Sequence, residues 1–378
     1  MSASSGLTTA FQDDPGPLSI AVMGPTGTGK TSLINLLSGS DLRIGRDLES
    51  CTDDVQVSKP FDLDGQMISL IDTPGFDDTN LSDAAVLNMI AAYLSYSYEQ
   101  GKRLAGVIYT HRILDNRVGG ISARSFRMFR NLCGEASLRN IIITTTMWDQ
   151  VEISLGEQRE KELASKDAFF KSAIEKGARL SRHDNTLESA QSIIRSIIQN
   201  NTAPVTLKIQ EELHNGVDIS DTQAGKEITR EIFEQMERHR LEMRGLLIEI
   251  QEATRTRDEE SRKELVEEKA RIESVIQRLH LDSTNIVKSY TDILLRMEER
   301  LGVAEKVNAA PKLGSQSKTT SGMGEYPGQQ THSPVVQAVA ATENSNAVLE
   351  GKLAAAVPVV GFWGKLAVML APFSLTWK

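Results

Sequence analysis

The glycine-rich segment GPTGTGKTS, from Gly24 to Ser32, limits what this chain can fold into more than any other feature. It follows the apolar run LSIAVM and precedes the helix-like run TSLINLLSG. A strand, a Gly-x4-Gly-Lys-Thr loop and a helix in that order form the phosphate-binding P-loop pattern. Its glycines tolerate backbone angles that let successive N–H groups point at an anion, and the dipole of the following helix adds to that site.

Each residue type in the loop predicts a contact with phosphate or metal. Lys30 is expected beside the terminal phosphates of a nucleotide, and the Thr31 hydroxyl is expected to ligate Mg²⁺. The full set of expected nucleotide contacts in the loop is Gly24, Thr26, Gly27, Thr28, Gly29, Lys30, Thr31 and Ser32. A glycine-rich turn without function is the alternative, and the flanking strand and helix argue against it.

Composition excludes several classes of protein. The 378-residue chain has a formal net charge of −9 and no run of five basic residues, so broad electrostatic binding to nucleic acid is not expected. Cys51 and Cys133 are the two cysteines, which provide neither a disulfide framework nor a zinc site and fit a reducing compartment. The first residues lack the pattern of a secretion signal. We therefore expect a cytoplasmic protein.

Residues 17–203, behind a polar leader at 1–16, alternate short apolar runs with helical patterns. Such alternation predicts a three-layer α/β fold, in which a mostly parallel sheet carries helices on both faces. The pair Asp64 and Gly65 predicts a tight turn between two antiparallel strands. The expected strands are residues 18–24, 55–63, 66–73, 104–111, 140–146 and 177–182.

A second motif, LIDTPGFDD, places Asp72 at the end of an expected strand and Gly75 shortly after it. A strand-end Asp opposite a P-loop can hold Mg²⁺ through water, and a following glycine N–H can reach a γ-phosphate. Proline and glycine also favour plain turns, which is the alternative. The position of the motif after Lys30, with a hairpin between them, favours a nucleotide site.

Together, GPTGTGKTS and DTPGFDD resemble the GTPase superfamily and, within it, the septin-like branch that includes the immunity-associated (AIG-type) and chloroplast import-receptor GTPases. The resemblance covers residues 17–203. It implies a domain that binds GTP and GDP with Mg²⁺ and has nucleotide-dependent switch segments. It also implies a homodimer formed across the nucleotide face.

The resemblance assigns a switch threonine between the P-loop helix and the second strand. Thr52 in LESCTDDVQV has the matching position, where its oxygens would face Mg²⁺ and the γ-phosphate. Ser50 is the competing residue, and a turn beginning at Thr52 is an open alternative. Lys30 and Thr52 are thus the expected catalytic residues, and Thr31, Thr52 and Asp72 are the expected metal-binding residues.

The superfamily reads its base with an Asn/Thr-Lys-x-Asp motif, which corresponds here to TMWD, residues 146–149. Asp149 would accept hydrogen bonds from guanine N1–H and N2–H₂, which adenine cannot supply. Met147 replaces the lysine, so this position carries no charge. A helix N-cap is the alternative role of Asp149. Ser181 and Arg182 are the nearest candidates for a last base-contacting loop.

Hydrolysis is expected to be slow, because Phe76 stands where Ras-like GTPases carry a water-positioning glutamine. The segment IYTHRILDNR contains His111, Arg112 and Arg117, from which an arginine could act on a partner's phosphates. The finger arginine of the resembling family corresponds to Ile108, so that role does not transfer. A solvent-facing position is favoured for either arginine.

Three functions follow from these residues. The first is a GTP-binding switch protein that hydrolyses GTP slowly and is activated by dimerisation of its GTPase domain. The second is a hydrolysis-deficient, nucleotide-dependent scaffold that assembles through a coiled coil. The third, an ATPase, would require equal competition by ATP for the same site.

Residues 204–302 are charged and helical, with heptad patterns that indicate a coiled coil or a helical hairpin. The polar stretch TRTRDEESRKE divides them and is either a solvated helix or the turn of the hairpin. One amphipathic helix packed on the first domain is the alternative. The heptad seams are Thr229, Met236, Met243 and Ile250; Ile232, His239, Leu246 and Ala253; and Leu265, Ile272, Leu279, Ile286 and Ile293.

The last two stretches differ in polarity. Residues 303–346 are rich in Gly, Ser, Gln, Thr and Ala and predict a flexible linker. Residues 347–378 form an apolar tail, within which 353–377 carry a single charge. That length suits a membrane span, which would attach the protein to the cytosolic face of a membrane, while its prolines and glycines argue against a continuous helix. An interfacial anchor and a segment docked in a protein groove remain open.

Overall fold

The structure, a computed structural model, describes residues 16–43, 54–78, 81–115, 121–200 and 203–309. The chain divides into two units, residues 1–310 and 311–378, and every described residue belongs to the first. The expected leader up to residue 15, the expected linker from residue 310 and the apolar tail lie outside the described residues.

In the described part of the chain, seven strands form one sheet in the order β2-β4-β1-β5-β6-β7, with β3 also paired to β4. β1 pairs in parallel with β4 and β5, and the pairs β5–β6 and β6–β7 are parallel too. The strands are β1 (Leu18–Met23), β2 (Gln56–Val57), β3 (Phe61–Leu63), β4 (Gln66–Asp72), β5 (Leu104–Arg112), β6 (Ile141–Thr146) and β7 (Arg179–Arg182). The expected mostly parallel sheet is confirmed.

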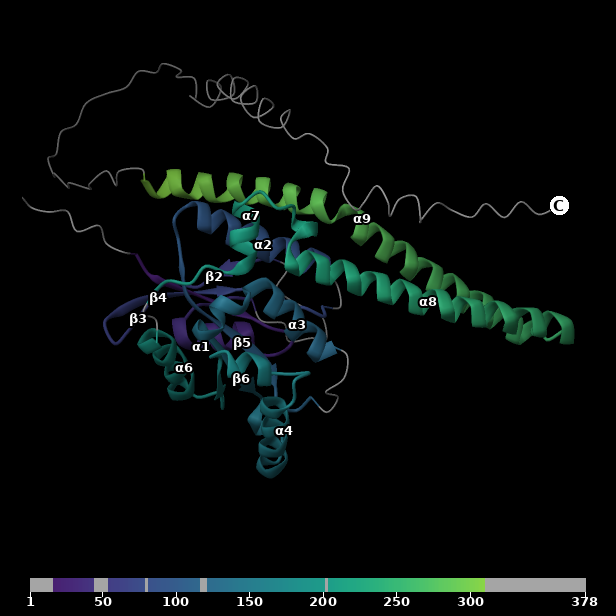
Figure 1. Ribbon diagram of the computed structural model, residues 1–378, viewed down its shortest axis with the longest axis horizontal. Helices are drawn as coiled ribbons and strands as arrows, with labels where there is room; N and C mark the ends of the chain where they lie inside the picture. Colours follow the sequence, from purple (N-terminus) through teal and green to yellow (C-terminus); the bar gives the residue numbers. More distant parts are fainter. Residues whose placement is uncertain (1–15, 44–53, 79–80, 116–120, 201–202, 310–378) are drawn as a thin grey trace, which may run out of the picture. The chain divides into compact units, whose positions relative to one another are not determined.

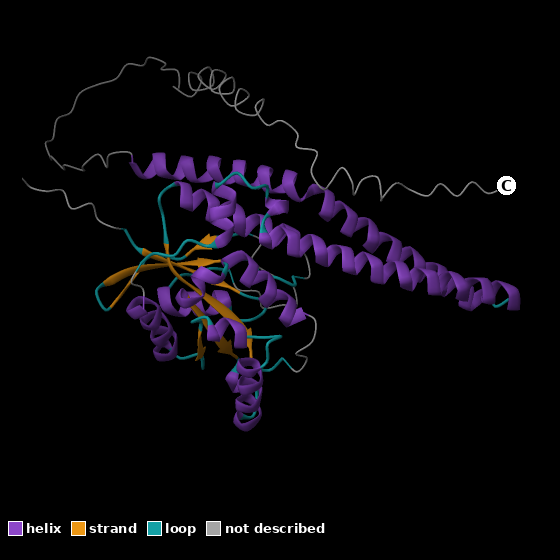
Figure 2. Ribbon diagram, in the orientation of Figure 1, coloured by secondary structure: helices purple, strands orange, loops and turns teal. Residues whose placement is uncertain are grey.

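Helices cover both faces of this sheet (Figure 2). Along β1, Ile20 and Val22 belong to a buried cluster with residues of α1 and α6, while Ala21 and Met23 belong to a second cluster with residues of α2 and α3. This alternation of side chains is what a buried central strand requires. The helices are α1 (Lys30–Ser38), α2 (Asp83–Glu99), α3 (Ile121–Cys133), α4 (Ile153–Ser165), α5 (Lys171–Glu175), α6 (Leu187–Asn200), α7 (Lys208–His214), α8 (Gln223–Thr256) and α9 (Glu259–Ala309).

The β3–β4 hairpin turns at Asp64 and Gly65, both with positive φ (54° and 81°), as a two-residue hairpin turn demands. The preceding run is not one continuous strand as expected. It forms β2 and β3, each antiparallel to β4, because Pro60 cannot donate a backbone hydrogen bond between them.

Helices α8 and α9 form an antiparallel helical hairpin, side by side in Figure 1. The chain reverses at Arg257, which has a φ of 60°, and Asp258 caps α9 by accepting a hydrogen bond from Ser261 N at 3.1 Å. The turn therefore falls inside the polar stretch that divides the heptads. Ile232 and Met236 of α8 and Ile286 of α9 are buried, as the heptad seams predict.

The base of the hairpin packs on the sheet domain through α2. Ile286 and Met297 of α9 share a buried cluster with residues of α2, and Asn88 Nδ2 donates to Ile286 O at 2.9 Å. The two helices thus form a hairpin, and the base of that hairpin also packs on the sheet domain, as the alternative expected for one long helix. Helix α9 continues to Ala309, past the expected start of the linker at residue 303. Within the described residues, none of the helices has the length and apolarity needed to cross a membrane.

Candidate functional site

The P-loop connects β1 to α1 at the carboxyl end of the parallel strands. Gly24, Gly27 and Gly29 have φ values of 142°, 74° and 88°, which non-glycine residues rarely adopt. Gly24 also lies so close to β5 that a Cβ there would stand 2.5 Å from Thr110 O. Both the backbone angles and the close approach explain why the loop is built from glycine.

Lys30, the first residue of α1, folds back over its own loop. Its ammonium donates to Gly24 O at 3.1 Å and to Pro25 O at 2.9 Å. Burial lowers the pKa of Lys30 to about 8, although the charges of Asp72 and Asp78 oppose that shift. The lysine is therefore held where its positive charge can face phosphate groups.

Asp72, at the end of β4, lies directly opposite the P-loop helix. Thr31 Oγ1 donates to Asp72 Oδ2 at 2.7 Å, and Asp72 Oδ1 has no hydrogen-bond partner among the described residues. Burial raises the pKa of Asp72, while the Thr31 hydrogen bond and the charge of Lys30 oppose the rise. A hydroxyl and a carboxylate with an unshared oxygen form an oxygen-only donor set, which fits Mg²⁺.

The loop after Asp72 packs against the P-loop rather than projecting into solvent. Thr26 N donates to Phe76 O at 3.0 Å, and Thr26 Oγ1 donates to Asp78 Oδ2 at 3.0 Å. A Cβ on Gly75 would stand 2.5 Å from Thr26 N, so only glycine allows this approach. The two motifs that the sequence places far apart therefore meet, as predicted.

Three threonine hydroxyls, one in the P-loop and one each at the carboxyl ends of β5 and β6, connect the loop to the sheet. Thr28 Oγ1 lies 2.6 Å from Thr110 Oγ1 of β5, and Thr146 Oγ1 of β6 donates to Thr28 O at 3.0 Å. All three side chains are buried. The roles of Thr110 and Thr146 were missed in the sequence, although both end strand-like runs whose carboxyl ends had to meet at the P-loop.

The expected base-reading motif follows β6 at the same edge of the sheet. Met147 has a φ of 61° and begins a short 3-10 turn in which Asp149 is exposed and makes no hydrogen bond or ion pair with a described residue. Helix α4 begins at Ile153 with Glu152 at its N-cap, so Asp149 does not cap that helix.

The expected last loop begins later than the sequence indicated. Ser181 and Arg182 are part of β7, because they continue its parallel register with β6, and are not loop residues. The guanidinium of Arg182 lies 4.2 Å from the ring centroid of Trp148 and forms ion pairs with Glu157 and Glu160. The loop itself starts at His183 and contains Asn185, whose φ is 63°.

Comparisons with known proteins agree with this geometry. Residues 19–117 match the family model described as 50S ribosome-binding GTPase. The chain carries a P-loop GTPase domain. The matched segment contains the P-loop, Asp72 and Gly75, and the fold around it is that of a GTP-binding domain.

Similar proteins match only part of the chain. The curated relative GTPase Der of Variovorax paradoxus (strain S110) is 27% identical over 165 residues, covering 43% of this chain and 35% of that protein. GTPase Der of Heliobacterium modesticaldum is 41% identical over 63 residues, covering 17% of this chain and 14% of that protein. The chain thus spans about a third or less of the length of these relatives.

Among solved structures, the GTPase domain is similar to Toc33 from Arabidopsis thaliana in complex with Mg²⁺ and GMPPNP, with 15% identity and a TM-score of 0.39. That match covers 50% of this chain and 88% of Toc33. The G domain of the FeoB iron transporter of T. maritima matches with 17% identity and a TM-score of 0.32, covering 49% of this chain and 99% of that domain.

The candidate trans-acting residues of the GTPase domain have different surroundings. His111 is buried, and burial lowers its pKa to about 4, so it is neutral at pH 7. Arg112 is partly exposed and lies against the P-loop of its own chain, with Nη1 3.6 Å from the position of a Cβ on Gly27. Ile108 is buried in the sheet. Ser50, Thr52 and Arg117 lie outside the described residues.

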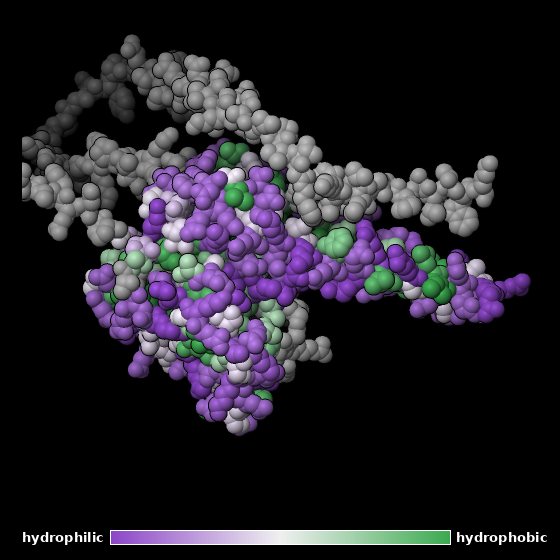
Figure 3. All heavy atoms as spheres, in the orientation of Figure 1, coloured by the Kyte–Doolittle hydropathy of each residue, from purple (hydrophilic) through white to green (hydrophobic). Residues whose placement is uncertain are grey.

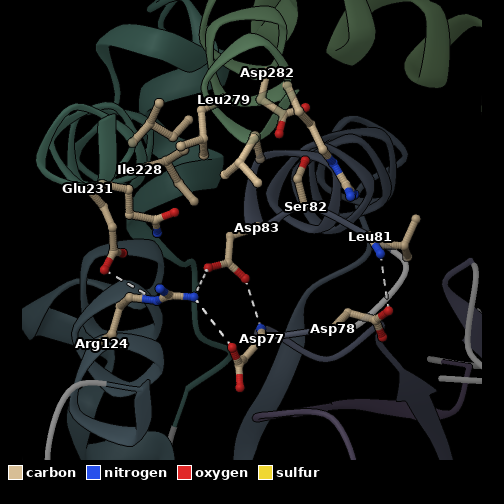
Figure 4. A pocket seen from close by; sticks show the side chains of 15 residues that line it. Asp77, Asp78, Leu81, Ser82, Asp83, Arg124, Ile228, Glu231, Leu279 and Asp282 are labelled. Atoms are coloured by element: carbon tan, nitrogen blue, oxygen red, sulfur yellow. Dashed lines mark hydrogen bonds and ion pairs between the residues drawn. The ribbon is translucent and has the colours of Figure 1, made fainter. Parts of the chain in front are cut away.

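A cavity of about 250 Å³ separates the loop after Phe76 from the helical hairpin (Figure 4). Arg124 of α3 crosses one side of it, with Nη2 2.8 Å from Asp83 Oδ2 and 3.5 Å from Asp77 Oδ1 and with Nε 3.2 Å from Glu231 Oε1 of α8. Burial raises the pKa of both Asp77 and Glu231. One guanidinium therefore links the motif loop, α2 and the hairpin of the GTPase domain.

Proposed function

We propose that the GTPase domain binds Mg²⁺·GTP and Mg²⁺·GDP and hydrolyses GTP slowly. The observation that carries the proposal is the convergence of Lys30, Thr31 and Asp72, with Thr31 Oγ1 2.7 Å from Asp72 Oδ2 beside the buried ammonium. Thr31 and Asp72 would hold the metal ion, which would neutralise phosphate charge when bound. Lys30 would exchange its carbonyl contacts for phosphate oxygens.

The slow rate follows from Phe76. Its side chain is buried and carries no group that could orient an attacking water, and its carbonyl is held by Thr26 N. In Ras-like domains a glutamine performs that task. Hydrolysis by this domain would then depend on a catalytic group from elsewhere. A second copy of the chain could supply that group, as expected for an AIG-type, septin-like GTPase that is activated by dimerisation.

Guanine selection is assigned to Asp149. Its carboxylate is exposed and has no partner among the described residues, at the end of the sheet where the P-loop lies. It can therefore accept hydrogen bonds from the N1–H and N2–H₂ edge of guanine. Adenine presents no such pair of donors, which favours GTP over ATP.

A hydrolysis-deficient scaffold is the second candidate, because the helical hairpin exposes large apolar side chains between charged ones (Figure 3). Leu241 and Ile248 of α8 are 61% and 69% exposed. The hairpin therefore offers apolar surface that a second protein chain could cover. Phosphate release measured at increasing protein concentration separates the two. A turnover number that rises with concentration supports the dimer-activated enzyme, and a flat value near zero supports the scaffold.

Equilibrium titration with GTP, GDP and ATP in the presence of Mg²⁺ tests the proposal itself. The parent protein should bind GTP and GDP in preference to ATP. The variant Lys30→Ala should bind neither guanine nucleotide, because the phosphates lose their buried cation. Binding of Mg²⁺·GTP by Lys30→Ala within a few-fold of the parent would show that the P-loop is not the site.

We further propose a cytosolic protein whose residues 353–377 contact a membrane, a protein groove being the competing partner. The support is the apolar character of that stretch, which contains a single charge.

A further inference from the structure

Two acidic side chains lie beside Lys30 at the phosphate site of the GTPase domain. Asp72 lies within hydrogen-bond reach of Thr31, and Asp78 accepts from Thr26 in the P-loop itself. The base motif contributes no positive charge, because Met147 occupies the position of its lysine. A nucleotide with two or three phosphates brings further negative charge, of which Lys30 and the Mg²⁺ proposed at Thr31 and Asp72 would neutralise only a part.

Arg112 is positioned to supply that charge. It is the last residue of β5, and its register partner on β6 is Thr146, whose hydroxyl donates to Thr28 O of the P-loop at 3.0 Å. Its Nη1 lies 3.6 Å from the position that a Cβ on Gly27 would take. The side chain therefore reaches the P-loop from β5, the strand adjacent to the one that ends just before Met147.

The hydrogen-bonding capacity of Arg112 is largely unused. Nε lies 3.0 Å from Asp115 Oδ1 without the alignment of a hydrogen bond, and neither terminal nitrogen donates to a described residue. The side chain is 37% exposed, so a ligand can reach it. Asp115 thus restrains the guanidinium near Gly27 while its outer donors stay available to an anion.

We propose that Arg112 binds the phosphates of the guanine nucleotide held by its own chain, replacing the charge that Met147 does not provide. A guanidinium forms charge-assisted hydrogen bonds with phosphate oxygens. The inference rests on the proposed nucleotide binding at the P-loop. It assigns to Arg112 a role in binding within one chain, in contrast to a finger that acts on a partner.

Equilibrium titration of the full chain with Mg²⁺·GDP and Mg²⁺·GTP tests this role. Arg112→Gln should lower the affinity for both nucleotides by about tenfold or more, because a charged hydrogen-bond donor is lost in both complexes. Arg112→Lys, which keeps a charge, should recover most of the affinity. Arg195→Gln is the matched control, since Arg195 is also 37% exposed and paired with an aspartate, Asp64, at 2.7 Å.

A structural role predicts a different result. Without nucleotide, Arg112→Gln should unfold at the same temperature as the parent, because an exposed ion pair contributes little. At a nucleotide concentration that saturates the parent, the nucleotide should raise the unfolding temperature of Arg112→Gln by less than it raises that of the parent. Unchanged affinity for both nucleotides, or a loss no larger than that of Arg195→Gln, would overturn the proposal, and so would an effect on turnover alone.

A mixing experiment distinguishes binding within one chain from binding across a dimer. Lys30→Ala protein retains Arg112 but should bind no nucleotide, so an excess of it can donate only its arginine. Restored nucleotide affinity of Arg112→Gln in the mixture would show action on a partner and overturn the assignment. If Lys30→Ala itself binds like the parent, the proposed function fails; if it loses binding and Arg112→Gln does not, only this inference fails.

Discussion

At the scale of single residues, the chemistry of the site was predictable where a motif fixes it and unpredictable where the fold creates it. Lys30, Thr31 and Asp72 follow from the spacing of two motifs, and the structure brings them together. The approach of Arg112 to Gly27 depends on the pairing of β5 with both β1 and β6. No local pattern encodes that pairing.

The buried ammonium of Lys30 should make the stability of the nucleotide-free protein pH-dependent. Its folded pKa, about 8, is below the ordinary lysine value of 10.5, so the unfolded chain binds the proton more tightly. The penalty is full below pH 8 and disappears as pH rises to 10.5, a gain of about 3 kcal/mol in the free energy of unfolding.

Urea unfolding of the parent and of Lys30→Met, at pH values between 7 and 10.5, measures this effect. The parent should gain stability relative to the methionine variant as the pH rises through 8, because other titrating groups cancel in the difference. A constant difference across this range would show that Lys30 is not desolvated.

The exposed carboxylate of Asp149 should decide which base is bound. Asp149→Asn should weaken GTP by about tenfold or more, because an amide cannot accept two hydrogen bonds from N1–H and N2–H₂. Xanthosine nucleotides, in which a carbonyl replaces N2–H₂, should gain affinity. Competition titrations read both changes, with the nearby exposed Glu152→Gln as control. An unchanged preference for GTP over XTP would remove Asp149 from the base site.

At the scale of elements, heptad spacing predicted the pairing of α8 with α9 but did not predict that the hairpin packs on α2. The seam residues Leu265, Ile272 and Leu279 are partly or fully buried, and the fifteen-residue step from Ile250 to Leu265 contains the turn at Arg257. The packing of α9 on α2 needs the sheet to be built first, so no periodicity could reveal it. Arg124, which links the hairpin base to the loop after Phe76, was missed for the same reason.

Removal of Arg124 should destabilise the domain at neutral pH. Arg124→Ala leaves Asp77, Asp83 and Glu231 close together without their shared cation, a loss of about 2–3 kcal/mol in the free energy of unfolding. Arg127→Ala, which removes a more exposed pair with Glu227 from the same helix, should lose less than about 1 kcal/mol.

Acid should reduce the Arg124→Ala deficit. Burial already raises the folded pKa values of Asp77 and Glu231, and loss of the guanidinium raises them further. A raised folded pKa costs stability above the unfolded pKa of the carboxyl group and reaches its full penalty above the folded pKa, so the deficit grows with pH and shrinks toward pH 5. Chemical unfolding at both pH values checks the sign, and a deficit that grows in acid would contradict the ion-pair account.

At the scale of the whole molecule, the GTPase domain and its hairpin form one unit that ends at residue 310. Deletion of residues 347–378 should therefore leave nucleotide affinity and thermal stability unchanged. If lipid is the partner of the apolar tail, the deletion should also move the protein from the membrane fraction to the supernatant.

Alkaline carbonate then separates two kinds of anchor. A spanning tail would stay in the pellet, and an interfacial helix would wash off. Full-length protein that is soluble and monodisperse without detergent would contradict membrane contact and favour docking of residues 353–377 on protein.

The side-chain amide of Asn88 on α2, which donates to Ile286 O of α9 at 2.9 Å, has a consequence for any shortened form of this protein. A premature stop or a protease cut after residue 203 would keep every nucleotide-binding motif yet strip α2 of its cover. The uncovered surface would include Leu94, whose carbonyl accepts from Gln210, and the apolar neighbours that share its cluster. Such a fragment would aggregate, so gene fusions and truncations can preserve this GTPase only when they retain the hairpin.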